Sequence, residues 1–117
     1  MEITWSKYFT ADVDYYRKKK KYTKINKDIL SVVAELKVGN LIGDKLENLH
    51  LDEGTAAYKV RVANSSANVG KSNGFRIIYY LALKDEIYLL TIYSKKDDDR
   101  IPTDATIMMM IKNIIDG

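Results

Sequence analysis

Cysteine is absent from this chain, which excludes a disulfide framework, a thiolate metal site and a cysteine nucleophile. No run of about 18 apolar residues is present either, so no segment is expected to span a membrane. The first residues, "MEITWSKYF", lack the apolar stretch of a signal peptide. We therefore expect a cytoplasmic protein with no membrane contact.

Histidine occurs only once, at His50, and no second histidine or cysteine is near it. A metal site is therefore not expected, although a single histidine suffices for general acid–base catalysis. A structural histidine at or near the surface is the ordinary alternative. Carboxylates gather at Asp97–Asp99, but without the spacing of metal ligands, and no serine stands in a G-x-S-x-G elbow. We expect no metal and no cofactor.

The segment "GKS", Gly70–Lys71–Ser72, invites comparison with a nucleotide-binding phosphate loop. Such a loop needs a glycine four residues before "GK", and that position is Ser65. It also needs a helix directly afterwards, whereas "FRIIYY" predicts a strand. The sequence therefore gives no support for nucleotide binding by this route.

The hydrophobic period changes from helical to alternating about halfway along the chain. We expect a strand at 2–5, helices at 6–20 and 23–39, strands at 57–63, 74–83 and 86–94, and a last helix from Thr103 or Asp104. Residues 39–56 are expected to be irregular, and Lys84–Asp85 to connect the last two strands tightly. The order β-α-α-β-β-β-α, with an antiparallel sheet, predicts an α+β fold in one domain, 1–117.

Charge is distributed unevenly, although the net charge is only +3. Arg17, Lys18–Lys21, Lys24 and Lys27 follow one another with no acidic residue before Lys27, whereas Asp97–Asp99 form an acidic block. Such asymmetry indicates an acidic partner, either a nucleic acid or an acidic protein. A solvated helix face is the alternative explanation for the lysine run.

Basic residues also occur within the predicted strands. Lys59 and Arg61 share one face of their strand, Arg76 lies near the start of the next, and Lys95–Lys96 end the last one, just after Tyr93. A meander would bring these groups onto one sheet face. Charges buried there without partners would be costly, so a wet groove for a polyanion is one explanation. Pairing of Arg76 with a carboxylate, or its position at a sheet edge, is the other.

The segments "YKVRVA", "GKSNGFRIIYY" and "IYLLTIYSKKD", within about residues 57–97, resemble the RelE/HigB branch of bacterial type II toxins. The expected element order agrees with that family across nearly the whole chain, although the first two helices match only in pattern. The resemblance implies a RelE-like fold and an endoribonuclease that cuts mRNA in the ribosomal A site without a metal. It further implies that a cognate antitoxin protein holds the enzyme inactive.

In the reaction that this resemblance implies, a ribose 2′-OH attacks the adjacent phosphorus, the 5′-oxygen leaves and a cyclic phosphate remains. Fixed lysine and arginine side chains stabilise the developing charge. The resemblance assigns catalysis to Lys59, Arg61, Arg76 and Lys96, and RNA binding to Lys71, Tyr93 and Lys95. Lys18, Lys19, Lys20 and Lys21 are expected to contact the ribosome.

Two departures from the family bear on activity. Lys96 takes the position of an arginine, which keeps the charge but loses the bidentate fork. Some members carry a tyrosine before the last helix that stacks on an mRNA base, and here that stretch is Ile101–Pro102–Thr103. Tyr93 is the candidate substitute for it.

Two other functions remain open from the sequence. The related ParE branch has much the same fold and inhibits DNA gyrase by protein–protein contact, without cutting RNA. A degenerate toxin that only binds its antitoxin is the other alternative. The basic "YKVRV" segment favours the ribonuclease.

Overall fold

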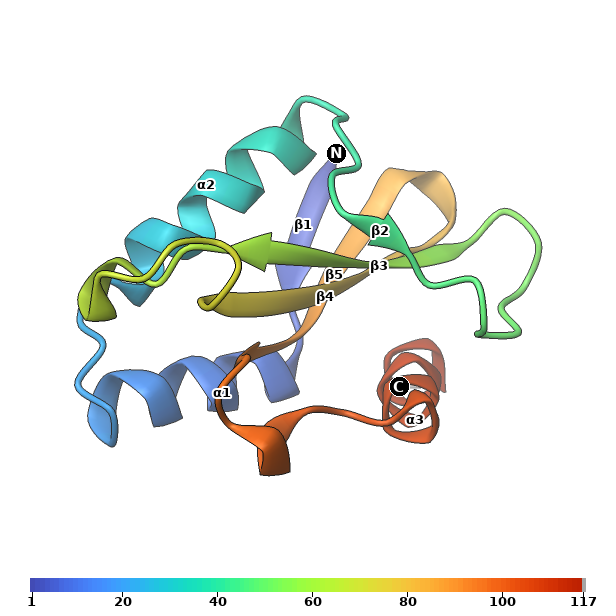
Figure 1. Cartoon of the computed structure of the whole chain (residues 1–117). Coiled ribbons are helices and arrows are strands. Elements are labelled where there is room, and N and C mark those ends of the chain that lie inside the picture. Colours follow the sequence, from blue (N-terminus) through green and yellow to red (C-terminus); the bar gives the residue numbers. More distant parts are fainter. Residues whose placement is uncertain (117) are drawn as a thin grey trace.

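A five-stranded mixed sheet forms the centre of the protein, with the strand order β1-β5-β4-β3-β2 (Figure 1). The computed structural model describes residues 1–116, and the side chains of residues 1–115. Its strands are β1 (Glu2–Trp5), β2 (Asp44–Lys45), β3 (Ala56–Val62), β4 (Phe75–Leu81) and β5 (Glu86–Ser94). Strand β1 runs parallel to β5, and the other neighbouring pairs are antiparallel.

Three α-helices pack around this sheet: α1 (Lys7–Lys18), α2 (Ile25–Lys37) and α3 (Asp104–Asp116). Ser6 is the N-cap of α1, because its Oγ accepts a hydrogen bond from the backbone N–H of Phe9 at 3.1 Å. Gly39 follows α2 with a φ of +87°, a conformation that glycine adopts without a Cβ penalty. None of the helices within residues 1–116 is both long and apolar enough to cross a membrane.

The α+β class and the predicted order of strands and helices agree with the structure, with one addition and one correction. The predicted antiparallel sheet is wrong at one edge, where β1 pairs parallel with β5 and makes the sheet mixed. Strand β2 lies in the stretch that the sequence predicted to be irregular, and it pairs with β3 at Lys59 and Tyr58. Two residues are too few to carry a hydrophobic period, so no sequence pattern marks this strand. Gly43 allows its close approach, since a Cβ there would lie 2.6 Å from the Lys59 carbonyl oxygen.

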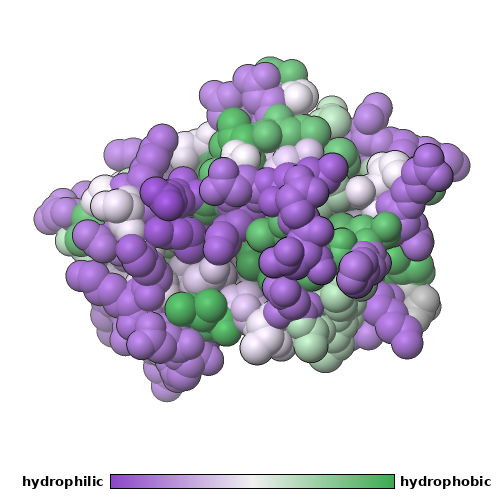
Figure 2. All heavy atoms as spheres, turned by 45° about the vertical axis from the view of Figure 1, so that its right-hand side comes forward, coloured by the Kyte–Doolittle hydropathy of each residue, from purple (hydrophilic) through white to green (hydrophobic). Residues whose placement is uncertain are grey.

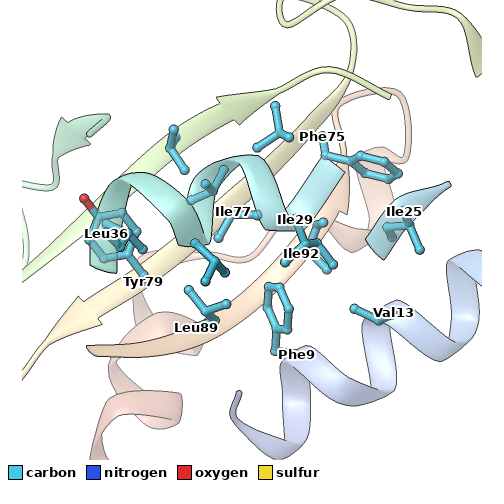
Figure 3. Close-up of a cluster of buried hydrophobic side chains, with 14 of the residues drawn as sticks. Phe9, Val13, Ile25, Ile29, Leu36, Phe75, Ile77, Tyr79, Leu89 and Ile92 are labelled. Carbon is cyan, nitrogen blue, oxygen red and sulfur yellow. The ribbon is translucent and has the colours of Figure 1, made fainter. Parts of the chain in front are cut away.

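Two hydrophobic clusters fill the two faces of the sheet, and alternate strand residues supply them. The first joins Phe9, Val13 and Tyr16 of α1 and the apolar face of α2 to one side of β3, β4 and β5 (Figure 3). The second joins α3 to the other side, where Ile78, Tyr80 and Leu90 point. Figure 1 shows α2 and α3 on opposite sides of the sheet. The helices and strands predicted from the sequence therefore supply the hydrophobic core.

The connection between β4 and β5 is tight, as predicted from the sequence. Lys84 and Asp85 both have positive φ values, 63° and 61°, within a short 3₁₀ turn. The pairing of Leu81 with Ile87 begins directly beyond them. The turn therefore places the opposite ends of the two strands, at Phe75 and Ser94, beside each other.

Candidate nucleic-acid interface

A row of three residues crosses the sheet at the end away from the β4–β5 turn. Arg61 on β3 pairs with Arg76 on β4, and Arg76 pairs with Tyr93 on β5. Directly opposed residues on neighbouring strands project to the same face, so the three side chains lie side by side. Of the basic residues expected on one sheet face, Arg61 and Arg76 therefore lie side by side, with Tyr93 beside them.

Arg76 is only 8% exposed, and its guanidinium binds the loop that precedes its own strand. Nη1 donates to the carbonyl oxygens of Lys71 at 3.0 Å and Phe75 at 3.2 Å, and Nη2 donates to that of Ser72 at 3.1 Å. Among the described residues, the side chain therefore contacts no carboxylate, and it lies on a central strand rather than at a sheet edge, so neither structural alternative considered from the sequence applies. These bonds explain why a guanidinium is tolerated in a buried strand: it satisfies three carbonyl groups of the 71–75 segment.

A groove of about 770 Å³ runs along the β3 edge between the sheet and α2. Its charged lining consists of Lys59, Arg61, Lys71, Asp28, Glu35 and Asp44. Three of the predicted site residues, Lys59, Arg61 and Lys71, thus border one cavity, and all three are exposed. Lys59 and Arg61 border it from the edge of β3, because Val60 and Val62 are the β3 side chains that face α2. Because β2 ends after two residues, the β3 edge at Arg61 is open along this groove.

Two of the carboxylates in this groove are already hydrogen-bonded within the protein. Asp28 accepts bonds from the backbone N–H of Ser65 at 2.9 Å and from its hydroxyl at 2.5 Å. Glu35 accepts a bond from the side-chain amide of Asn40 at 2.8 Å. These bonds hold the 64–68 loop and the end of α2 beside the groove. Asp28 and Glu35 therefore have a structural role there.

Lys95 and Lys96 form an exposed turn after β5, and this turn lies against the loop that Arg76 binds. The backbone N–H of Lys95 donates to the carbonyl oxygen of Gly74 at 3.0 Å. Gly74 is required there, because an added Cβ would lie 2.2 Å from the Val62 carbonyl oxygen. The Lys95–Lys96 turn and the Arg76 loop therefore form one continuous surface.

Tyr93 is 5% exposed, and its ring belongs to the cluster beneath α3. Burial raises the pKa of its hydroxyl, and the nearby Arg76 charge lowers it in part. A ring buried in this way has no free face for a base. The structure therefore does not support Tyr93 as a substitute for the base-stacking tyrosine, and Ile101–Thr103 supplies no aromatic ring in its place.

The lysine run at Lys18–Lys21 is exposed and lies at the end of α1. Sequence reasoning separated it from the strand site. In the structure, however, Lys20 Nζ lies 3.8 Å from Asp97 Oδ1, and Asp97 directly follows Lys96. The positive surface therefore continues from the end of α1 to the Lys95–Lys96 turn.

Sequence reasoning missed the residues that connect α1 to the end of β5. Asp12 accepts bonds from Thr91 Oγ1 at 2.5 Å, the Ile92 N–H at 3.1 Å and Arg100 Nη2 at 3.0 Å. The Arg100 guanidinium also lies over the Tyr15 ring, 3.8 Å from its centroid. These partners are about 80 residues apart in sequence, so no local pattern could have indicated them.

His50 is exposed and lines a separate, mostly apolar groove beside α3, with Met109 and Ile115. On the face shown in Figure 2, hydrophobic side chains reach the surface in patches between hydrophilic ones. Within the described part of the chain, no group of three or more histidine or carboxylate side chains could hold a metal ion. The open edge of β3 at Lys59 and Arg61, together with Lys71 and the Lys95–Lys96 turn, is the strongest candidate for a functional site.

Compared with known proteins, this chain matches no protein-family model and no curated protein.

Proposed function

We propose that this protein is a RelE/HigB-type toxin, an endoribonuclease that cuts mRNA on the ribosome by metal-independent transesterification. The observation that carries the proposal is the gathering of basic groups from separate segments around one end of the sheet. Arg61 and Arg76 pair across β3 and β4, and Lys71 and Lys95 belong to the loop and turn beside them. Such a surface suits a polyanion and a reaction in which negative charge develops on phosphorus.

In this mechanism, the exposed cations contact the scissile phosphate and stabilise the phosphorane that forms when the 2′-oxygen attacks. Lys59 and Arg61 are available for this role, because neither has a carboxylate partner within 4.0 Å in the described structure. Lys96 neutralises charge on the departing 5′-oxygen. Arg76 holds the 71–75 loop in place, and its remaining N–H donors add a positive potential at the same point.

The proposed partners are the ribosome with its mRNA and a cognate antitoxin that blocks the site. Lys18–Lys21 contact ribosomal RNA, where charge–phosphate contacts supply affinity and salt dependence without specifying sequence. Because the substrate is a translating ribosome, the protein acts in the cytoplasm.

The test is translation in vitro with primer extension on the mRNA, using the purified protein. We expect breaks at A-site codons, and we expect Arg61→Ala to reduce the cleavage rate about 100-fold to 1,000-fold, the range for losing one transition-state donor. Lys37→Ala is the matched control, since Lys37 lines a groove beside β1 at the opposite edge of the sheet. Absence of A-site breaks, or equal losses in both variants, would contradict the proposal.

The same assay tests whether the protein needs a bound divalent ion other than the Mg²⁺ that the ribosome itself requires. We expect purified programmed ribosomes that are held in a fixed Mg²⁺ concentration to be cut equally well by protein that was first stripped with EDTA. Cleavage that needs the protein to be reloaded with a divalent ion would refute this part of the mechanism.

One observation favours a second candidate, a module that binds its antitoxin but does not cut RNA. The arginine that the resemblance places at the phosphate is buried and bonded to three carbonyl groups. A protein that binds ribosomes or antitoxin but leaves mRNA intact would support this candidate. A gyrase supercoiling assay, run beside it, would detect ParE-like inhibition.

A further inference from the structure

We infer that Tyr16, a residue of α1, is a positioning residue that holds the Lys95–Lys96 turn for catalysis. This inference rests on the proposed function, because it concerns how one part of that site is held. Tyr16 does not reach the groove itself. It acts through the two residues that flank the lysines in sequence, Ser94 and Asp97.

One hydroxyl group contacts both flanks of the turn. The Tyr16 Oη accepts a hydrogen bond from the backbone N–H of Ser94 at 2.7 Å and donates one to Asp97 Oδ2 at 3.0 Å. Lys95 and Lys96 are the only residues between these two contacts in sequence. The hydroxyl therefore fixes where the turn leaves β5 and where it ends.

The donor and acceptor roles of this hydroxyl are fixed by its surroundings. Tyr16 is 0% exposed, and burial is the main cause that raises its pKa far above the usual value of 10.0. The neighbouring Asp97 carboxylate raises it further. The hydroxyl thus keeps its proton at any pH at which ribosomes function, and it always has a hydrogen to donate to Asp97.

The Tyr16 ring packs against the residue that precedes Arg76 on β4. It packs edge-on against Phe75, with the ring centroids 5.3 Å apart, and stacks on Tyr22 at 6.0 Å. Phe75 directly precedes Arg76 on β4. Tyr16 therefore connects the strand that carries Arg76 with the turn that carries Lys96.

When this hydroxyl is removed, the far end of the turn loses the one hydrogen bond that holds the Asp97 side chain. The Lys95 N–H still binds the Gly74 carbonyl oxygen, which holds the near end of the turn. Asp97 keeps two backbone bonds, from its N–H to the Ser94 carbonyl oxygen and from the Arg100 N–H to its own carbonyl oxygen, but its side chain keeps only a 3.8 Å ion pair with an exposed Lys20. Within the turn, the Lys96 N–H keeps a long bond of 3.4 Å to Ser94 Oγ. Lys96 would then sample positions around the phosphate, which lowers the chemical rate more than the affinity.

The test compares Tyr16→Phe with Tyr79→Phe. Each variant keeps a fully buried ring and loses one hydroxyl group. The Tyr16 Oη makes two hydrogen bonds, and the Tyr79 Oη makes one, which it donates to the Ile42 carbonyl oxygen at 2.5 Å. We expect Tyr16→Phe to lower the single-turnover cleavage rate on saturated ribosomes about 10-fold to 100-fold, with half-saturation unchanged. We expect Tyr79→Phe to keep the wild-type rate, although it also loses thermal stability.

A double-mutant cycle with Lys96→Ala shows whether Tyr16 acts through the turn. If it does, Tyr16→Phe causes little further loss in a protein that already lacks the Lys96 ammonium. Independent, multiplicative losses would overturn the inference, as would equal rate losses in Tyr16→Phe and Tyr79→Phe.

Amide hydrogen exchange at Ser94–Asp97 is the readout that does not depend on activity. We expect faster exchange there in Tyr16→Phe and no change in Tyr79→Phe. Faster exchange with an unchanged cleavage rate would refute the positioning role and leave the ribonuclease standing. A wild-type protein that does not cleave at all would instead remove the proposed function, and this inference with it.

Discussion

Replacing Arg76 by alanine should reduce both stability and activity, and the structure sets the size of each effect. The guanidinium makes three hydrogen bonds to carbonyl groups, and bonds of a charged donor contribute about 1.5–3 kcal/mol each. Water replaces part of that contribution at Lys71 and Ser72, which are exposed. We therefore expect a loss of about 2–4 kcal/mol in the free energy of unfolding. In a domain of this size, this lowers the melting temperature by about 8–16 °C.

The activity of Arg76→Ala has to be measured below its melting temperature and compared with Arg61→Ala. The Arg61 side chain is exposed and makes none of the side-chain hydrogen bonds or ion pairs found in the described residues, so its loss should leave the melting temperature within about 2 °C. Expression of the wild-type chain should arrest growth, and both variants should relieve the arrest. A folded Arg76→Ala protein with full toxicity would refute the assignment. An unchanged melting temperature would refute the role given to its hydrogen bonds.

Three further predictions concern other parts of the molecule. Replacing Lys18–Lys21 with glutamine should weaken ribosome binding and flatten its salt dependence with little change in the cleavage rate at saturation; normal binding with slow cleavage would place this run in the active site. Gly74→Ala should unfold more easily in urea than Gly70→Ala, because only the first adds a Cβ against backbone atoms. Burial raises the pKa of Asp12 above 3.8, so its protonation favours folding. That contribution is present below pH 3.8 and lost as pH rises through the raised pKa, and unfolding curves of Asp12→Asn should lack this dependence.

The helices and strands could be predicted because their signals are local. Phe9, Val13 and Tyr16 repeat at helical spacing, and Tyr58, Val60 and Val62 alternate, so each element shows its buried face in its own sequence. The pairing of Arg61 with Arg76 also follows once two alternating strands are joined as a meander. The sequence therefore predicts four of the five strands and the shared face of Arg61 and Arg76, but neither β2 nor the parallel pairing of β1 with β5.

The burial and hydrogen bonding of each site residue could not be predicted, because they depend on partners distant in the chain. Arg76 and Arg61 occupy the same row, yet one is buried under its own loop and the other is exposed at an open edge. The bond from Ser94 to the Tyr16 hydroxyl spans 78 residues. Helical periodicity marks Tyr16 as a core residue, and nothing in that pattern distinguishes a hydroxyl that positions a turn from one that only fills space.

The structure places the acidic block at Asp97–Asp99 next to the lysine run, rather than apart from it. From the sequence it is the opposite pole to the lysine run. In the structure, Asp97 lies between the two sets of cations, bound to Tyr16 and 3.8 Å from Lys20. A carboxylate in this position offsets the mutual repulsion of Lys20, Lys95 and Lys96 in the free protein.

The ion pair between Lys20 and Asp97 is nevertheless weak. The Lys20 side chain is 41% exposed, and exposed pairs of this kind contribute about 0–1 kcal/mol. An RNA phosphate can therefore replace Asp97 as the partner of Lys20 at little cost. The bond from Tyr16 to Asp97 is shorter and joins groups that are more deeply buried, so it persists when that exchange occurs. Binding of the lysine run to RNA thus need not loosen the turn that holds Lys96, which keeps affinity and catalysis separable on one continuous basic surface.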